Sequence, residues 1–264
     1  MLPPPYSALA HFFLELVAYF LGLRLFLRAK ARSLNAVAVH PEGLAVVVGA
    51  VLGAAIGSKV LAWGQFPAFA FADFPDPVAL LSGKTVVGGF LGGLVGVELA
   101  KWRVGLREST GDLFVTPLLV ATGIGRLGCL LASLEDYTYG NPTGLPWGLD
   151  FGDGVRRHPV ALYEIGFLAL LATTLYLLEP RFRRSGDRFR VFLAGYLAFR
   201  FLVEFLKPPH GGFGPALPGQ PMAYLYFETL TAIQLACLAG LAYYFRDLVR
   251  FSREWPKELA WPAR

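Results

Sequence analysis

The sequence is poor in charged residues and in cysteine, and each shortage excludes a class of protein. Charged residues make up 16% of the 264 positions and hydrophobic residues 55%, whereas a soluble domain carries about 25% charge. This composition argues against a disordered chain, a coiled coil and a nucleic-acid-binding domain, so the net charge of +5 needs another origin. The two cysteines, Cys129 and Cys237, are too few for a disulfide framework or a zinc site.

Motifs that bind cofactors are also missing. The chain has no P-loop, no dinucleotide-binding glycine fingerprint and no pair of histidines with the spacing of metal ligands. We therefore expect no cofactor and no metal. The last hydrophobic stretch, 227–245, contains no lysine, which argues against a retinal pump because such a pump needs a Schiff-base lysine there.

Long apolar stretches dominate the chain instead. A bilayer core about 30 Å thick needs about 20 apolar residues in one helix. Seven stretches qualify: 9–28, 43–62, 83–100, 113–133, 159–178, 191–206 and 227–245. They predict an all-α integral membrane protein with seven transmembrane helices in a single domain, 1–264. The third stretch is rich in glycine, and the spacings Gly88/Gly92 and Gly89/Gly93 favour close helix packing.

The distribution of lysine and arginine predicts the orientation. Seventeen of the 24 basic residues lie in four alternate connections or ends, at 24–32, 101–107, 181–190 and 246–264. The opposite side has only Arg156, Arg157 and Lys207. Because basic residues are retained on the cytoplasmic side, this asymmetry predicts an outside N-terminus and a cytoplasmic C-terminus.

Two connections on the outer side are long and rich in glycine and proline. They cover 134–158 and 207–226. Such composition is typical of irregular lids and binding loops rather than of helices. We therefore expect irregular outer-side loops at both places.

Several ionisable residues fall inside the apolar stretches, where each one is expensive and marks a site by default. They are Glu15, Lys59, Lys84, Glu98, Arg126, Glu164, Arg200 and Glu204. Lys59 and Glu98 are interpreted as structural, with Lys59 snorkelling or pairing with Glu98 or Glu15. Arg200 and Glu204 are four residues apart on one helical face, so they are expected to meet, as a structural ion pair or as part of a site.

Positive charge gathers in the outer half of the predicted bundle. The residues concerned are Lys84, Arg126, Arg156, Arg157, His158, Arg200 and Lys207. Carboxylates are too few to neutralise them, which indicates an anionic ligand. Arginine suits phosphate because its planar fork donates paired hydrogen bonds, and a phospholipid headgroup is the phosphate available at that depth. His158 is either a helix-start residue or, beside two arginines, a neutral and base-competent imidazole.

These residues together resemble the prolipoprotein diacylglyceryl transferase family over nearly the whole chain. The motifs that carry the resemblance are Gly125-Arg126-Leu127-Gly128-Cys129, Glu135, Tyr139-Gly140, Leu145-Pro146-Trp147-Gly148, Arg157-His158-Pro159, Leu162-Tyr163-Glu164, Arg200-Phe201-Leu202-Val203-Glu204-Phe205, Gly88-Gly89, Asp112 with Pro117, and Gln234. The seven spans and the outside N-terminus are also what the family has, and the resemblance implies a bacterial inner membrane.

The resemblance implies transfer of diacylglyceryl from phosphatidylglycerol to the lipobox cysteine of a preprolipoprotein. By this likeness Arg126 and Arg200 would hold the phosphate, and Glu204 would orient Arg200. Glu135, Tyr139 and His158 would surround the headgroup or the thiol, and Tyr19 would face the cavity. The substrate-binding set would also include Tyr163, Gly88 and Gly89. The implied partners are phosphatidylglycerol, the lipobox preprolipoprotein and membrane lipids.

The sequence departs from the family at three motif positions. Val87 stands where a histidine precedes the Gly-Gly pair, Cys129 replaces an asparagine, and Ala161 replaces a glutamine. The base is therefore open between His158, Glu135 and Lys84. The alternative is a phospholipid-binding or lipid-handling protein that keeps the fold and the phosphate site without this catalysis.

Overall fold

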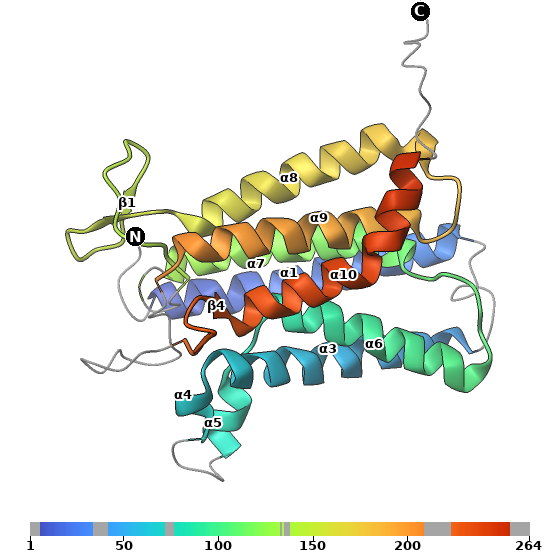
Figure 1. Cartoon of the computed structure of the whole chain (residues 1–264), viewed down its shortest axis with the longest axis horizontal. Helices are drawn as coiled ribbons and strands as arrows, with labels where there is room; N and C mark the ends of the chain where they lie inside the picture. Colours follow the sequence, from blue (N-terminus) through green and yellow to red (C-terminus); the bar gives the residue numbers. More distant parts are fainter. Residues whose placement is uncertain are drawn as a thin grey trace, which may run out of the picture.

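Seven long helices run through the part of the chain that the computed structural model describes, which is 6–33, 42–71, 77–132, 134, 138–208 and 223–253. They are α1 (Tyr6–Arg32), α3 (Gly43–Gln65), α6 (Val86–Val104), α7 (Asp112–Ala132), α8 (Val160–Leu178), α9 (Asp187–Val203) and α10 (Ala232–Arg253). Each predicted apolar stretch coincides with one of these helices, and the prediction of an all-α protein is confirmed (Figure 1).

Most helix boundaries differ from the predicted ones by a few residues, and α10 ends eight residues later than predicted. Two of the differences, at the starts of α9 and α10, have a clear structural reason. α9 begins at Asp187, four residues before the predicted 191, because Gly186 adopts a left-handed conformation (φ 90°) that starts the helix there. α10 begins only at Ala232, since the preceding residues form a tight hairpin of β3 (Leu225–Tyr226) and β4 (Leu230–Thr231). Hydropathy reads apolar content and not backbone turns, so it could not place either boundary.

Five of the described helices are long and apolar enough to cross a bilayer: α1, α3, α7, α8 with the following turn, and α10. Their outward faces carry large apolar side chains that are mostly exposed, such as Phe13 on α1 and Leu170 on α8. Apolar side chains of this size and number are exposed where lipid replaces water as the solvent. The chain is therefore an integral membrane protein.

Glycine stripes hold α3 and α6 together. Gly49, Gly53 and Gly57 of α3 face Gly96, Gly92 and Gly88 of α6. A methyl group on Gly57 would lie 2.5 Å from the Gly88 carbonyl oxygen and 2.6 Å from the Gly92 Cα, so no larger residue fits. The prediction that Gly88 and Gly92 serve close helix packing is confirmed.

The remaining long helices form a second body of the fold beside this pair. α1 and α7 pack along each other, α9 lies between α8 and α10, and α10 also reaches α3 and α6. The core of this part is formed by fully buried side chains of α8, α9 and α10, including Leu175, Phe192, Tyr196, Leu197 and Cys237. α9 is thus the most enclosed of these elements, and its polar residues are presented to the interior.

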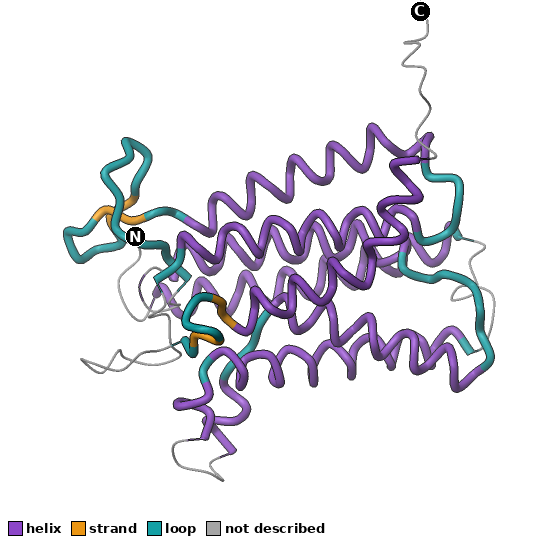
Figure 2. The backbone as a smooth tube through the Cα atoms, in the orientation of Figure 1, coloured by secondary structure: helices purple, strands orange, loops and turns teal. Residues whose placement is uncertain are grey.

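The loop-rich segments gather at one end of the bundle, opposite the C-terminal end of α10 (Figures 1 and 2). The predicted loop 134–158 contains a small hairpin, β1 (Leu149–Asp150) paired with β2 (Arg156–Arg157). The Asp150 side chain accepts hydrogen bonds from the Gly152 and Gly154 amides and closes the turn. Of the predicted loop 207–226, residues 209–222 lie outside the described part.

Short helical segments complete the described chain. They are α4 (Pro67–Phe71), α5 (Pro77–Ser82) and the 3₁₀ turns Glu179–Arg181 and Glu204–Leu206. The last of these continues α9 beyond Val203, so Glu204 stays stacked over Arg200. That continuation fixes the geometry of the site described next.

Candidate functional site

A cavity of about 930 Å³ extends through the interior between the α1–α7 pair and the α3–α6 pair. α9 and α10 close it on a third side, with Arg200 and Ile233 in its wall. Most of its lining is apolar, with Phe90, Leu94 and Leu118 along its length. Its volume is within the range of ligand-binding pockets, and its lining favours an apolar ligand.

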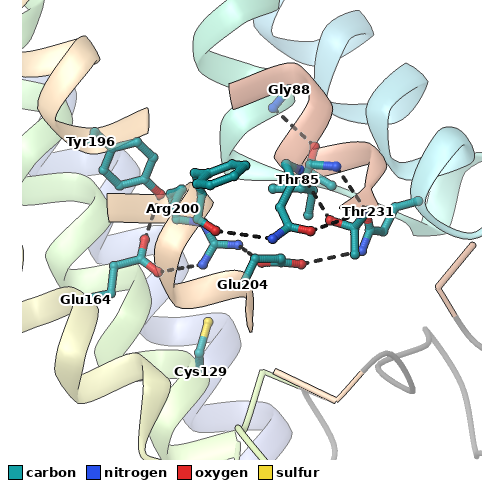
Figure 3. A network of polar contacts seen from close by, with 12 residues as sticks. Thr85, Gly88, Cys129, Glu164, Tyr196, Arg200, Glu204 and Thr231 are labelled. Carbon is teal, nitrogen blue, oxygen red and sulfur yellow. Dashed lines mark hydrogen bonds and ion pairs between the residues drawn. The ribbon is translucent and has the colours of Figure 1, made fainter. Parts of the chain in front are cut away.

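Glu164 joins the two arginines that the sequence singled out. Its carboxylate lies 3.0 Å from Arg126 Nε and 3.4 Å from Arg200 Nη1. The Glu164 side chain is only 1% exposed. The Tyr196 hydroxyl donates a third contact to it at 2.7 Å (Figure 3). One buried carboxylate thus holds α7, α8 and α9 in a fixed relation and orients both guanidinium groups.

Arg200 is also paired along its own helix. Its Nη2 donates to Glu204 at 2.8 Å, which confirms the predicted meeting of these two residues. Gln65 Nε2 approaches the other Glu204 oxygen at 3.4 Å, and Gln65 Oε1 accepts from the Ile233 amide at 3.1 Å. Arg200 Nε is buried and makes no hydrogen bond within the described part of the chain. This network ties Arg200 to α3 and α10.

Cations outnumber carboxylates where the cavity approaches the loop-rich end. Its lining there includes five cations, Lys59, Lys84, Arg126, Arg200 and Lys207. The lining carboxylates of this region are Glu15 and Glu204, and Glu164 lies directly behind the wall. Within the described chain, the surplus is positive even after pairing. Fixed positive charge in a water-poor cavity favours an anionic group such as phosphate.

Cys129 projects toward the arginine network from α7 (Figure 3). Arg126 Nη1 lies 3.6 Å from the Cys129 sulfur. They are three positions apart on one helix, so the thiol and the guanidinium share a face of the cavity. The departure from the family's asparagine therefore falls in the lining and not in the helix-packing surface.

α1 contributes a polar face that sequence reasoning identified only in part. His11, Glu15 and Tyr19 all line the cavity. The Tyr19 hydroxyl donates to Glu15 at 2.6 Å, and Lys84 Nζ pairs with the same carboxylate. The predicted placement of Tyr19 at the cavity agrees with the lining. His11 was missed, although the four-residue spacing of His11, Glu15 and Tyr19 within an apolar span is a sequence signal that could have revealed it.

His158 and Tyr163 lie in a separate cluster at the loop-rich end. His158 Nδ1 is 3.1 Å from the Tyr163 hydroxyl, which also accepts from Trp147 Nε1 at 2.9 Å. Neither residue is among those that line the cavity in the described chain. The structure thus brings these two predicted site residues together, but apart from Arg126 and Arg200.

Tyr139 belongs to the base of the β1–β2 hairpin. The Arg157 guanidinium stacks over its ring at 5.2 Å and pairs with Asp153 at 2.6 Å. The hydrogen bond from Arg157 lowers the pKa of the Asp153 carboxyl below its usual value. Arg157 is therefore engaged in shaping the hairpin, and Tyr139 is outside the cavity lining.

The remaining predicted site residues divide between packing and lining. Gly88 is buried against Gly57, and its amide donates to the Thr85 hydroxyl that caps α6. Gly89 lines the cavity. Glu135 lies outside the described residues. Val87, at the position of the family's histidine, is 1% exposed and also lines the cavity.

Together, these features define an integral membrane protein with a large, mostly apolar cavity and a cationic site held by buried carboxylates. The family model described as prolipoprotein diacylglyceryl transferase matches residues 16–245. The chain belongs to this family of transferases.

Individual relatives carry the same description. A phosphatidylglycerol–prolipoprotein diacylglyceryl transferase of Bordetella parapertussis is 34% identical over 183 residues, covering 67% of each chain. One from Nitratidesulfovibrio vulgaris is 34% identical over 209 residues, covering 73% of this chain and 70% of its own. One from Bordetella bronchiseptica is 28% identical over 230 residues, covering 73% and 87%.

Proposed function

We propose that this chain moves the diacylglyceryl group of phosphatidylglycerol to the lipobox cysteine thiol of a preprolipoprotein. The observation that carries the proposal is the pair of arginines, Arg126 and Arg200, held by Glu164 in the wall of a large, mostly apolar cavity. Membership of the transferase family and the names of the relatives support the same reaction.

The reaction displaces a phosphate ester from an sp³ carbon by a thiolate. Arg126 and Arg200 would bind the phosphate and stabilise the negative charge that grows on it as the carbon–oxygen bond breaks. Glu204 and Glu164 would keep the two guanidinium groups in place, because each is held by a short contact. In water the same interactions would be much weaker, so the apolar lining contributes to the rate.

The other predicted residues have narrower proposed roles. Tyr19 and Gly89 would contact the lipid within the cavity, and Gly88 would let α3 approach closely enough to form its wall. Tyr139, Tyr163 and His158 would act at the loop-rich end, where the preprolipoprotein arrives. The family's motifs would give Glu135 a part in the same reaction. These assignments rest on the family's motifs and on the positions of the described residues.

The proposed setting is a bacterial inner membrane crossed seven times, with the N-terminus outside and the C-terminus in the cytoplasm. The support is the distribution of lysine and arginine, since the four basic connections and ends alternate with the outer ones along the chain. α6 and α9 would cross as well, their charged and glycine-rich sequences being shielded by neighbouring helices. This places the loop-rich end on the side where secreted preprolipoproteins emerge.

The test is transfer from phosphatidylglycerol to a lipobox peptide by the purified chain, followed by mass spectrometry of the thioether. Arg126→Ala and Arg200→Ala should each lower the rate by at least about 100-fold, as loss of a transition-state charge contact does. Arg126→Lys and Arg200→Lys keep the charge but lose the planar fork, so intermediate rates are expected.

Arg103→Ala is the matched control, because Arg103 is an exposed arginine in the last turn of α6. It should leave the rate unchanged. Native rates in both Arg126→Ala and Arg200→Ala would overturn the assignment of these arginines to the phosphate. Binding of phosphatidylglycerol without any thioether product would instead favour the lipid-handling alternative.

A further inference from the structure

The cavity face of α1 carries His11, Glu15 and Tyr19 at intervals of one helical turn. The adjoining faces of the helix are apolar, and Phe12 and Phe13 are 55% and 60% exposed. A row of polar side chains on one face of an apolar span is expensive unless it serves a site. The family's motifs do not account for His11 or Glu15.

The contacts between α1 and α7 fix the depth of these side chains. A methyl group on Gly128 would lie 2.9 Å from the His11 ring, and one on Gly22 would lie 3.3 Å from the Ala121 methyl. The two helices are therefore antiparallel. Because a helix rises about 1.5 Å per residue, Glu15 lies level with the turn that contains Arg126. The His11 imidazole passes over Gly128, at the level of Cys129.

Glu15 connects this face to the start of α6. Its carboxylate accepts from Tyr19 and pairs with Lys84, which precedes α6 by two residues. Val87 follows Lys84 by three residues, in the first turn of α6, and lines the same cavity. His11 precedes Glu15 by one helical turn on the same face of α1. His11 and Glu15 therefore line the same cavity as Val87, which stands where other family members have their histidine.

Each neighbouring helix contributes charged or nucleophilic side chains to the cavity around His11 and Glu15. α7 contributes Arg126 and Cys129, α3 contributes Lys59, and Lys84 stands at the start of α6. Among the described residues that line the cavity, His11 supplies the imidazole, since His158 is bonded to Tyr163 elsewhere. Arginine keeps its proton at neutral pH and cannot act as a base, while Lys59 donates to the Leu81 carbonyl and Lys84 pairs with Glu15.

We infer that His11 is the general base of this chain and that Glu15 is its positioning residue, on a different helix from the histidine of other family members. The inference rests on the proposed function. A His11 nitrogen accepts the proton of the lipobox thiol. The thiolate sulfur then forms a bond to the glycerol carbon, and the carbon–oxygen bond to the phosphate breaks with its electron pair going to the phosphate oxygen. The carboxylate of Glu15 stabilises the imidazolium.

The test compares two lipobox peptides, one with cysteine and one with selenocysteine in its place. His11→Gln should lower transfer to the cysteine peptide by about 10²–10⁴-fold at pH 7, the usual worth of a general base. The loss should shrink as the pH approaches about 8.5, where a free thiol ionises by itself. A selenol is already ionised at pH 7, so His11→Gln should transfer to the selenocysteine peptide at close to the native rate.

Two further variants sharpen the comparison. Phe13→Ala, on the lipid face of α1, should leave both rates unchanged. Glu15→Gln should slow transfer to the cysteine peptide in the native chain but have little further effect in the His11→Gln chain, because the two residues act as one unit.

Each outcome has one meaning. An unchanged rate and pH profile in His11→Gln would overturn the inference, and so would an equal loss with both peptides, which indicates a structural role. If the native chain forms no product with either peptide, the proposed function itself fails, irrespective of His11.

Discussion

At the residue scale, the site is governed by how a few buried charges are compensated. Glu164 is 1% exposed in its side chain and faces Arg126, Arg200 and Tyr196. Burying the carboxylate and the two guanidinium groups away from water costs free energy, and only their mutual contacts offset that cost. The sequence predicted that these arginines mark a site, but not that a single carboxylate joins them.

Glu164→Gln should therefore destabilise the protein strongly. Removing one partner of a buried ion pair leaves uncompensated charge and costs about 3–5 kcal/mol. Thermal unfolding in detergent would show a clearly lower Tm. The matched control is Glu179→Gln, whose partner Arg188 is 3.7 Å away and whose side chain is 58% exposed. That change should cost no more than about 1 kcal/mol. Equal losses in the two variants would contradict this account of Glu164.

At the element scale, the walls of the cavity depend on how closely helices approach. Gly57 and Gly92 bring α3 and α6 into backbone contact, whereas α1 packs on α7 through side chains such as His11 and Ala121. The space between these two pairs is the cavity. A change that forces α3 from α6 should therefore alter both stability and the width of the site.

Gly57→Ala tests this dependence. The added methyl would meet backbone atoms of α6 at 2.5–2.6 Å, which cannot yield as a flexible side chain would. Overpacking of this kind costs about 1–3 kcal/mol, so the Tm in detergent should fall. Gly166→Ala in α8 is the control, since no heavy atom lies within 4 Å of its new methyl. It should keep or slightly raise the Tm because alanine favours helices. A Gly57→Ala variant as stable as Gly166→Ala would refute close packing here.

The elements also show how far the sequence alone could lead. Apolar length located all seven helices, and the spacing of Arg200 and Glu204 predicted their ion pair. The hairpin before α10 and the role of His11 escaped, for related reasons. The hairpin depends on which segments meet in space, since Leu225 and Tyr226 pair with later residues. The spacing of His11, Glu15 and Tyr19 was present in the sequence, but it did not show that α7 places Arg126 and Cys129 in the same cavity lining. Periodicity along one helix carries no such information.

At the scale of the whole molecule, the number of helices that cross the membrane determines on which side each loop lies. Five described helices satisfy length and apolar content, while α6 and α9 coincide with predicted spans but carry more glycine or charge. The basic residues at 101–107 and 181–190 follow the cytoplasmic pattern only if both helices cross. α3 shields α6 from lipid, and α8 and α10 shield α9. This shielding lowers the free-energy cost of placing their glycine and charged residues in the membrane.

Reporter fusions at three positions decide this. With seven spans, a reporter inserted after Gly105 is cytoplasmic, one at Gly152 is outside, and green fluorescent protein at the C-terminus fluoresces in the cytoplasm. If α6 did not cross, the reporters at Gly105 and Gly152 would exchange sides, because α7 would then run in the opposite direction. If α9 did not cross, the first two would stay as predicted and the C-terminus would move outside. The orientation matters for the reaction, since only an outside Gly152 puts the loop-rich end, and with it Arg126 and Arg200, on the side where a secreted preprolipoprotein presents its thiol.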